Sequence, residues 1–295
     1  MATARDLSYK ITSLSNMQKV MSAMNMIAST KLRKIMIRQP ALKQFNSMVD
    51  SIGADIISGL KSFESPLIHE PHTIKNMHIV VITADKGLCG SHNSSVLKAL
   101  VKTLQEENQR GVAVDITCIG ARAKKLCRRL DFKVCHAIDS NEQHISDAAL
   151  REIAYKIVKR VNRGEIDKVV LVYNHFVSTL VQKTQQLQIL PLIQKKEFNK
   201  EQSDSRKLET EAESEPRPAD FIFPAANLYL YYKLKIALTD SYLSEHAARM
   251  TAMEKAKTNA EDLINRYVKI RNRARQDTIT SELIEIVAGT EALNN

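Results

Sequence analysis

The chain has 295 residues and a formal net charge of +10, with 5% aromatic residues and no tryptophan. Few aromatic residues and many Ala, Met, Leu, Lys and Glu residues favour long helices over a dense all-β core. No apolar run approaches the roughly 18 residues of a membrane span, so we expect a soluble or peripheral protein of one large or two smaller domains.

The first predicted element is a long helix over residues 2–39, a stretch without glycine or proline. Apolar residues recur in it at steps of three and four and mark one face, with an interruption at Gln18. They are Leu7, Ile11, Leu14, Met21, Met24, Ala28, Leu32 and Ile35. Pro40 is expected to kink or end the helix, and a helical period then continues towards Gly59. Because residues 1–39 are basic and almost free of acids, a mitochondrial transit peptide is the alternative interpretation.

Short apolar strands then alternate with helices. The strands are predicted over residues 77–84, 112–119, 132–138 and 166–173, with an imperfect fifth within 176–190. The helices between them are predicted over 94–107, 121–129 and 147–162, the last with Ser146 as its N-cap. This alternation indicates an α/β sheet with helices on its faces.

The loop after the first strand, residues 85–91 (DKGLCGS), is rich in small residues at a strand-to-helix junction. Such loops can bind phosphate through backbone N–H groups. This loop matches neither G-x-x-x-x-G-K-[ST] nor G-x-G-x-x-G, so we favour a structural turn over a phosphate site. His92 follows without a carboxylate or thiol partner in the sequence, and we predict a surface or capping residue.

Residues 195–220 differ in composition, with eight acidic residues and neither isoleucine nor valine. Such a stretch cannot bury enough apolar surface to offset the entropy lost on ordering, so a flexible insertion is predicted. The predicted division of the chain is an N-terminal helical segment over 1–60, an α/β domain over 74–194, the acidic insertion over 195–220 and a C-terminal helix over 221–295.

The C-terminal stretch from residue 225 contains no proline and one glycine, Gly289. Apolar residues fall in it at alternating steps of three and four: Met253, Ala256, Ala260, Leu263, Tyr267, Ile270 and Ala274. An unbroken helix over 225–288 would measure about 96 Å, against roughly 40–45 Å for the diameter of a globule of this mass. The N-terminal helix is its natural partner, and because the chain returns through a whole domain the two helices can pair antiparallel.

A basic cluster lies near the C-terminal end of this predicted pair. It consists of Arg266, Lys269, Arg271, Arg273 and Arg275, with no acid among them. Three interpretations stay open: a solvated basic face, a docking face for acidic protein loops, or a nucleic-acid stripe. Tyr267 is the only aromatic residue within the cluster, so the stacking typical of single-strand binding is missing.

The sequence offers no catalytic or metal-binding constellation. The cysteines Cys89, Cys118, Cys127 and Cys135 form no C-x-x-C pair and have no histidine at metal-ligand spacing, so we expect reduced, partly buried thiols in a non-secreted protein. The eight histidines are scattered, and neither G-x-S-x-G nor HExxH occurs. We therefore predict no metal, no cofactor and no catalytic residue.

Four stretches in the same order resemble the γ subunit of F-type ATP synthases and together span almost the whole chain. They are residues 10–33 (KITSLSNMQKVMSAMNMIASTKLR), 83–96 (TADKGLCGSHNSSV), 244–264 (SEHAARMTAMEKAKTNAEDLI) and 273–293 (RARQDTITSELIEIVAGTEAL). The sequence departs from the family pattern at Ser91 and His92, where a glycine and an aromatic residue are usual. The acidic stretch 195–220 also stands where the family has a shorter connection.

The resemblance implies an α/β fold with an antiparallel coiled coil of long N- and C-terminal helices plus a Rossmann-like α/β domain. It implies a non-catalytic rotor subunit of the central stalk, which couples proton-driven rotation of the c-ring to conformational cycling of the catalytic β subunits. The implied partners are the α3β3 hexamer, the c-ring and the δ and ε stalk subunits, with one copy of this chain per complex and no nucleic acid. The implied location is peripheral on the mitochondrial inner membrane, matrix side, or on the cytoplasmic side of a bacterial plasma membrane.

The resemblance also implies residue roles. By motif match, Arg275, Gln276, Thr280 and Glu282 fall where the family's shaft contacts a loop of β, although Thr280 and Glu282 could equally be N-cap and first-turn residues of a helix. The basic shaft face is Arg266, Lys269, Arg271 and Arg273. The expected seam of the shaft includes Met21, Met24, Met253, Ala260, Leu263, Tyr267 and Ile270.

Two alternatives to a rotor remain at this point, a coiled-coil scaffold with a Rossmann-like module and a nucleic-acid-binding helical protein. A scaffold would dimerise through its own seams, whereas in a rotor the two seams pair within one chain. Beyond Ala274 the apolar steps shift to Ile279, Leu283 and Ile286. The rotor interpretation predicts that the C-terminal helix loses its partner there and continues alone.

Overall fold

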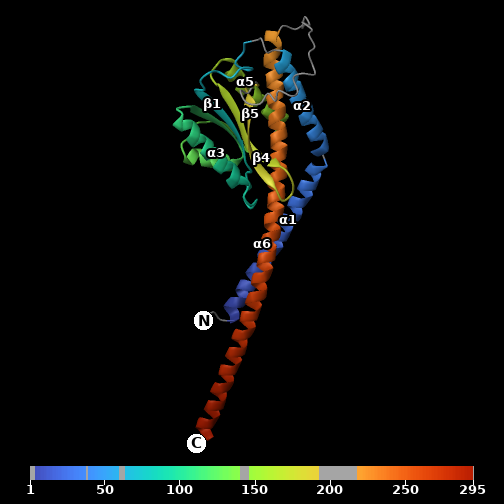
Figure 1. Cartoon of the computed structure of the whole chain (residues 1–295). Coiled ribbons are helices and arrows are strands. Elements are labelled where there is room, and N and C mark those ends of the chain that lie inside the picture. Colours follow the sequence, from blue (N-terminus) through green and yellow to red (C-terminus); the bar gives the residue numbers. More distant parts are fainter. Residues whose placement is uncertain (1–3, 38, 60–63, 140–145, 193–217, 295) are drawn as a thin grey trace. The chain divides into compact units, whose positions relative to one another are not determined.

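The structure is a computed structural model that describes residues 4–37, 39–59, 64–139, 146–192 and 218–294 (Figure 1). Its contacts divide the chain into two units, one of residues 1–30 with 249–295 and one of residues 31–248. The first unit is built from helices and the second contains the sheet. Most of the predicted acidic insertion lies outside the described residues.

The N-terminal region forms two helices, α1 (Ala4–Met36) and α2 (Gln39–Gly59). The break before Pro40 was predicted. Proline has no backbone N–H and fits only the first turn of a helix, where that N–H would have no intrahelical partner. Pro40 accordingly stands at the second residue of α2.

The sheet of the second unit has five strands in the order β3-β2-β1-β4-β5. They are β1 (Asn76–Ile82), β2 (Ala113–Ile119), β3 (Val134–Ile138), β4 (Lys168–Phe176) and β5 (Gln182–Leu190). The first four are parallel, and β5 pairs antiparallel with β4. The predicted α/β sheet is confirmed, including the imperfect fifth strand.

Three helices connect the parallel strands: α3 (His92–Gln109), α4 (Ala121–Arg129) and α5 (Asp147–Asn162). The start of α5 is fixed as predicted, because the hydroxyl of Ser146 accepts a hydrogen bond of 3.1 Å from the backbone N–H of Ala149. The long helix α6 (Pro218–Asn294) begins earlier than expected and contains Pro224 in its second turn. Its described start therefore precedes residue 221, where the C-terminal helix was predicted to begin.

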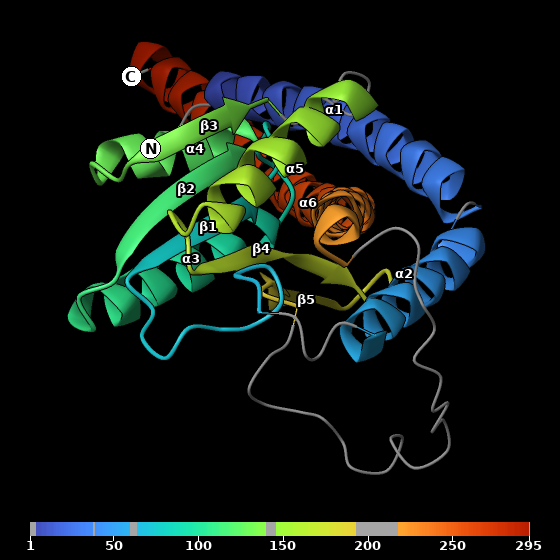
Figure 2. The same ribbon diagram turned by 90° about the horizontal axis from the view of Figure 1, so that it is seen from above.

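The sheet has α3 and α4 on one side and α5 and α6 on the other (Figure 2), and its two faces carry separate apolar cores. Side chains of α3 and α4 cover one face, where Leu100 and Cys127 pack with Ile79 of β1. Side chains of α5 and of α6 cover the other, where Ile157 and Leu230 join the same cluster. Alternate residues of the central strands point to opposite faces, so both faces of β1 and β4 are apolar, as in a doubly covered parallel sheet.

The loop after β1 is held by structural hydrogen bonds. The Asp85 carboxylate accepts a bond of 2.8 Å from the backbone N–H of Ala121, and the Asn93 side-chain oxygen accepts one of 2.9 Å from Ala84. The prediction that His92 is a surface residue is wrong. It is 2% exposed, and the side-chain amide of Asn174 lies 3.0 Å from its Nδ1. The partner comes from β4, far along the sequence, so no local pattern indicated it.

Candidate interaction surface on the terminal helices

Within the first unit, the start of α1 pairs antiparallel with α6. The side-chain amide of Asn25 donates a hydrogen bond to the Glu254 carboxylate, and further towards the N-terminus the Lys10 ammonium lies 5.9 Å from the centre of the Tyr267 ring. As residue numbers fall along α1, they rise along α6 (Figure 1). The predicted antiparallel pairing within one chain is confirmed.

The seam of α1 has the predicted heptad spacing but is more polar than a plain apolar stripe. Its inward residues alternate at steps of four and three: Leu7, Ile11, Leu14, Gln18, Met21, Asn25 and Ala28. Leu7 and Ala28 are buried and the others are half-buried, and Met24 lies half-buried beside them. Polar residues at such positions reduce stability but restrict the register of the pair.

The predicted seam of α6 is wrong at two positions, since Leu263 is 41% and Ile270 is 51% exposed. The inward residues are instead Met253, Lys257, Ala260, Ile264, Tyr267, Arg271 and Ala274. A heptad seam has two rows, and the row of Met253, Ala260 and Tyr267 was identified correctly. The second row lies four residues further on rather than three. It contains the two long basic side chains Lys257 and Arg271, whose aliphatic stems can line a seam although their ends are charged.

The basic cluster divides between two faces of α6. In a helix with 3.6 residues per turn, side chains that are close in sequence point in different directions. Arg266, Lys269 and Arg273 are exposed and share an outward face. Arg271 and Arg275 face α1 instead, where with Arg5, Ser8 and Asn272 they line a hollow of about 370 Å³. None of these five lining residues is acidic. Three guanidinium groups around one hollow can bind a carboxylate or phosphate oxygen from another molecule.

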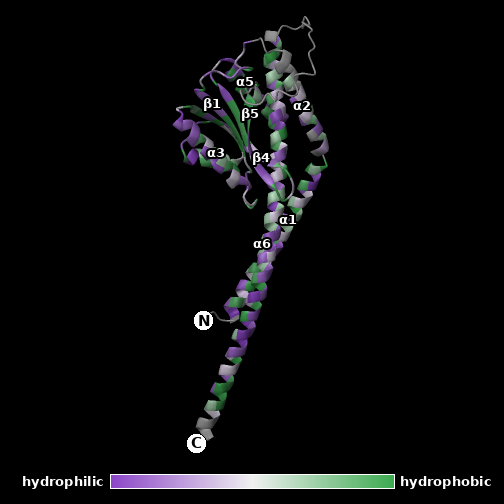
Figure 3. Ribbon diagram, viewed as in Figure 1, coloured by the Kyte–Doolittle hydropathy of each residue, from purple (hydrophilic) through white to green (hydrophobic). Residues whose placement is uncertain are grey.

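Beyond the hollow, α6 continues without a partner from the described part of the first unit. Every residue from Arg275 to Thr290 is exposed, and the apolar residues among them are 45–63% exposed. These residues are Ile279, Leu283, Ile284, Ile286 and Val287. Figure 3 shows the hydrophobic colouring returning towards this end of α6. Neighbouring apolar side chains left in solvent mark a surface that binds another protein or membrane.

The four residues matched to the family's β contact are all exposed on α6. The alternative that Thr280 and Glu282 start a helix is wrong, because α6 runs on to Asn294 and the Thr280 hydroxyl donates a 2.9 Å hydrogen bond to the carbonyl of Gln276. The four do not share one face. Gln276 and Thr280 continue the outward basic face, whereas Arg275 and Glu282 continue the face of Arg271.

The described residues contain no group of three His, Cys, Asp or Glu side chains that could hold a metal ion. None of the four cysteines forms a disulfide bond within the described residues, and three are buried while Cys135 is half-buried. In the part of the chain that the structure describes, no helix combines the length and the apolar character needed to cross a bilayer.

A family model described as ATP synthase matches residues 3–293. The ATP synthase gamma chain of Chlorobium phaeobacteroides is 34% identical over 301 residues, which cover 99% of each chain. The chain belongs to the ATP synthase gamma chain family. Gamma chains of Chlorobaculum tepidum and Helicobacter pylori are 32% and 31% identical, each over 99% of this chain. The resemblance inferred from the four sequence stretches is therefore confirmed.

Solved structures agree in fold. A central-stalk chain of the Tetrahymena thermophila mitochondrial ATP synthase is 25% identical, with a TM-score of 0.57 over 80% of this chain and 99% of its own length. A chain of the Euglena gracilis mitochondrial ATP synthase is 18% identical, with a TM-score of 0.70 over 98% of this chain and 94% of its own length. A gamma chain is a subunit of the central stalk, and the described fold of α/β sheet and paired terminal helices is that of the family.

Proposed function

We propose that this gamma chain is the rotor shaft of a proton-translocating ATP synthase. It turns with the c-ring and passes torque to the α3β3 hexamer, and the β subunits carry the catalytic residues. The observation that carries the proposal is the pairing of α1 with α6 inside one chain, beyond which α6 continues alone with exposed apolar side chains. A scaffold that dimerised through its seams would leave those seams unpaired in the single chain.

The shaft acts through shape and charge and performs no bond chemistry. Two helices joined by a heptad seam make a stiff element, and the faces of α6 beyond the seam differ from one another. A catalytic subunit that meets the Arg273 face experiences other contacts than one that meets the Arg275 face. Each state of the β subunit is favoured by the contacts it makes with the face that it meets, and rotation exchanges those faces in turn.

The proposed contacts with β are Arg275, Gln276, Thr280 and Glu282, which the motif match selects. Their division over two faces implies two separate contacts, since one loop cannot touch both faces of a helix at once. The hollow lined by Arg5, Arg271 and Arg275 would take a carboxylate of an acidic loop. The outward row of Arg266, Lys269 and Arg273 would attract acidic loops more loosely, as exposed charges do.

The proposed assembly contains one copy of the chain, together with the c-ring and the δ and ε stalk subunits, on the surface of an energy-coupling membrane. Within that location we propose the matrix side of the mitochondrial inner membrane, with the cytoplasmic side of a bacterial plasma membrane as the alternative. The solved structures named above are from mitochondrial enzymes, which suits the former, whereas the curated relatives named above are bacterial. Fractionation of source cells with antibodies against the chain decides between the two.

Purification of the tagged chain from detergent-solubilised membranes tests the rotor function. We expect a nucleotide-binding hexamer to co-purify with one copy of this chain per three pairs of large subunits, measured by native mass spectrometry. Light scattering on the isolated chain is the companion measurement. A stable homodimer that lacks the hexamer would identify the scaffold alternative and exclude the rotor.

A further inference from the structure

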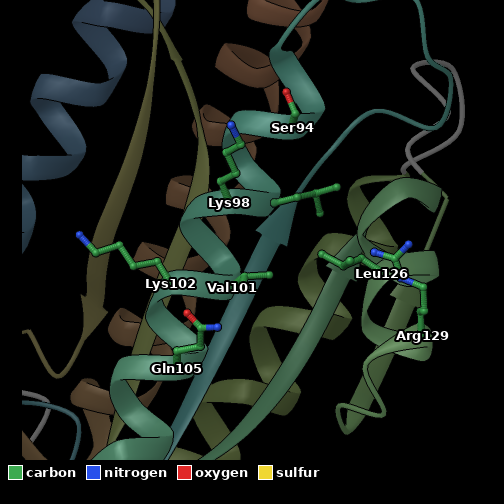
Figure 4. Close-up of a pocket in the computed structure, with 8 residues that line it drawn as sticks. Ser94, Lys98, Val101, Lys102, Gln105, Leu126 and Arg129 are labelled. Atoms are coloured by element: carbon green, nitrogen blue, oxygen red, sulfur yellow. The ribbon is translucent and has the colours of Figure 1, made fainter.

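The second unit has a groove that the rotor function does not use, between α3 and α4 on the outer side of one sheet face (Figure 4). Its volume is about 410 Å³. Its lining residues are Ser94, Leu97, Lys98, Val101, Lys102, Gln105, Leu126 and Arg129. The inner stripe of α3, which includes Val96 and Leu100, is buried against the sheet. Leu97 packs partly against the same core, and Val101, one turn further along α3, extends the apolar surface of the helix into the groove.

The groove has an apolar floor and a polar, basic rim. Leu97, Val101 and Leu126 are half-buried, and in Figure 4 the side chains of Val101 and Leu126 point towards each other across the space between the helices. The other lining residues are exposed. Lys98 and Lys102 stand along α3, and Arg129 stands across the floor on α4.

The charge around the groove is one-sided. The nine residues of α4 include five basic side chains and no acidic one. On α3, the Lys102 ammonium lies 3.8 Å from the Glu106 carboxylate, and because both side chains are exposed this is a weak contact that another carboxylate can replace. A ligand that fits this surface therefore presents apolar groups to the floor and carboxylates to both sides of it.

The dimensions fit a helix. Lining residues on α3 run from Ser94 to Gln105, which is about 17 Å along the helix axis at about 1.5 Å per residue. That length matches three turns of a third helix, and the space between two packed helices is where the ridge of a third packs. A bilayer would need apolar side chains that protrude, whereas Leu97, Val101 and Leu126 are half-buried between the helices. Single-stranded nucleic acid would stack on aromatic residues, and the lining has none.

We propose that the groove between α3 and α4 binds an acidic amphipathic helix of a partner protein. Its apolar side chains, spaced i, i+3, i+4 and i+7, would pack on Leu97, Val101 and Leu126. Its flanking glutamates or aspartates would pair with Lys98 and Lys102 on one side and with Arg129 on the other. The basic rim sets the orientation and the rate of association, and the floor provides the affinity.

The test uses the full chain and a labelled helical peptide of roughly 14 residues, with leucines at that spacing and glutamates on both flanks. Fluorescence anisotropy in about 0.15 M salt should give a dissociation constant in the tens of micromolar. A peptide of the same composition in scrambled order should bind at least about tenfold more weakly, because it has no apolar face. Equal binding of the two peptides would overturn the proposal.

Variants of the chain locate the site. The double change Lys98→Glu with Lys102→Glu lies on exposed positions, so the fold should survive, and it should weaken the acidic peptide at least about tenfold. A peptide with lysines in place of the glutamates on one flank should bind this variant better than the original chain. Lys183→Glu, an exposed lysine on β5, is the matched control and should change nothing.

Circular dichroism confirms that the variants are folded, and Leu126→Ser provides a second test by removing floor contact without changing charge. Loss of peptide binding in Leu126→Ser supports the groove. Unchanged binding in both Leu126→Ser and the lysine variant would exclude it. Duplex DNA and vesicles with phosphatidylserine are run as competitors. If either binds with the same sensitivity to Lys98 and Lys102 while the helical peptide does not, the partner class is wrong.

Discussion

His78 on β1 and Thr117 on β2 form a hydrogen bond across two parallel strands, with 2.9 Å between Nε2 and Oγ1. Both side chains are fully buried, and Nδ1 of His78 has no hydrogen-bond partner among the described residues. Burial, and after it the charge of Arg160, lowers the pKa of His78 to about 4. The folded protein therefore holds this ring neutral at pH values where an exposed histidine would be charged.

We predict that this histidine makes the second unit sensitive to acid. In the unfolded chain the ring takes up a proton near pH 6.5, whereas in the folded chain it does so only near 4. Stability should therefore fall as the pH falls through this window, by up to about 3 kcal/mol from this group. His78→Gln cannot titrate, so its free energy of unfolding should fall less steeply. Urea denaturation at several pH values measures both slopes, and parallel curves would contradict the prediction.

Local signals predicted the α/β part of the fold well. Ser146 starts α5 as expected because N-capping acts over three residues, and the bounds of α4 match the predicted 121–129. The burial of His78 and His92 was not predictable in the same way. Their partners Thr117 and Asn174 lie 39 and 82 residues away, and only the strand order brings them together.

The shaft seam shows the same limit. Apolar spacing identified the row of Met253, Ala260 and Tyr267, and it correctly indicated where the pairing ends. It then selected Leu263 and Ile270, because apolar residues are the expected occupants of a seam. Lys257 and Arg271 occupy the second row instead, and the opposite seam is also partly polar, with Gln18 and Asn25. Which residues face inward depends on the pairing of both helices, which the spacing within one helix does not determine.

A second prediction concerns Arg160 on α5, whose guanidinium forms an ion pair with Asp115 on strand β2. Its guanidinium lies 2.5 Å from the Asp115 carboxylate and 3.2 Å from that of Glu165. Burial alone would raise the pKa of Asp115, but hydrogen bonds from Arg160 and Lys133 outweigh burial and lower it. Arg160→Ala leaves Asp115 with Lys133 alone. We expect a loss of about 2 kcal/mol, less than for a fully buried pair because the Arg160 side chain is 28% exposed.

Arg160→Lys is the matched control for this change. A lysine keeps the charge but cannot bridge two carboxylates with one planar group, so it should recover only part of the stability. Chemical denaturation followed by far-UV circular dichroism compares the three proteins. Identical stability of Arg160→Ala and the original chain would show that the ion pairs of Arg160 with Asp115 and Glu165 do not stabilise the fold.

We predict that the polar residues in the seam of α1 lower the stability of the α1–α6 pair while they restrict its register. Gln18 is half-buried on the inward face of α1, so Gln18→Leu should stabilise the helix pair by about 1 kcal/mol. Lys19→Leu adds the same apolar group at an exposed neighbouring position and should have little effect. Thermal melting of the full chain measures the difference. A larger gain at residue 19 than at residue 18 would place the seam elsewhere.

The exposed apolar side chains at the end of α6 predict that the isolated chain aggregates. Leu283 is 56% and Ile286 is 63% exposed, and the double change to serine should reduce aggregation measured by light scattering. Leu180→Ser removes a leucine that is 79% exposed in the second unit and serves as the control. In the assembled complex the same end of α6 should gain protection from hydrogen exchange. Equal exchange in the free and assembled chain would argue against a contact between this end of α6 and the α3β3 hexamer.

The hollow lined by Arg5, Arg271 and Arg275 predicts a salt effect that distinguishes the two basic faces. Like charges around one space repel, so the helix pair of the isolated chain should become more stable as salt screens them. Arg275→Gln removes one of the three charges and should raise stability by about 0.5 kcal/mol at low salt, with a smaller dependence on salt. Arg273→Gln changes a charge on the outward face and should leave the salt dependence as it was. Melting curves across a salt series test this prediction. If the melting temperatures of both variants depend on salt equally, Arg275 is not repelled by the other two arginines of the hollow.

Added phosphate tests whether the hollow binds an anion. A raised melting temperature in phosphate, present in the original chain and absent in Arg275→Gln, would show that it does, and a carboxylate of an acidic loop of β would be such an anion.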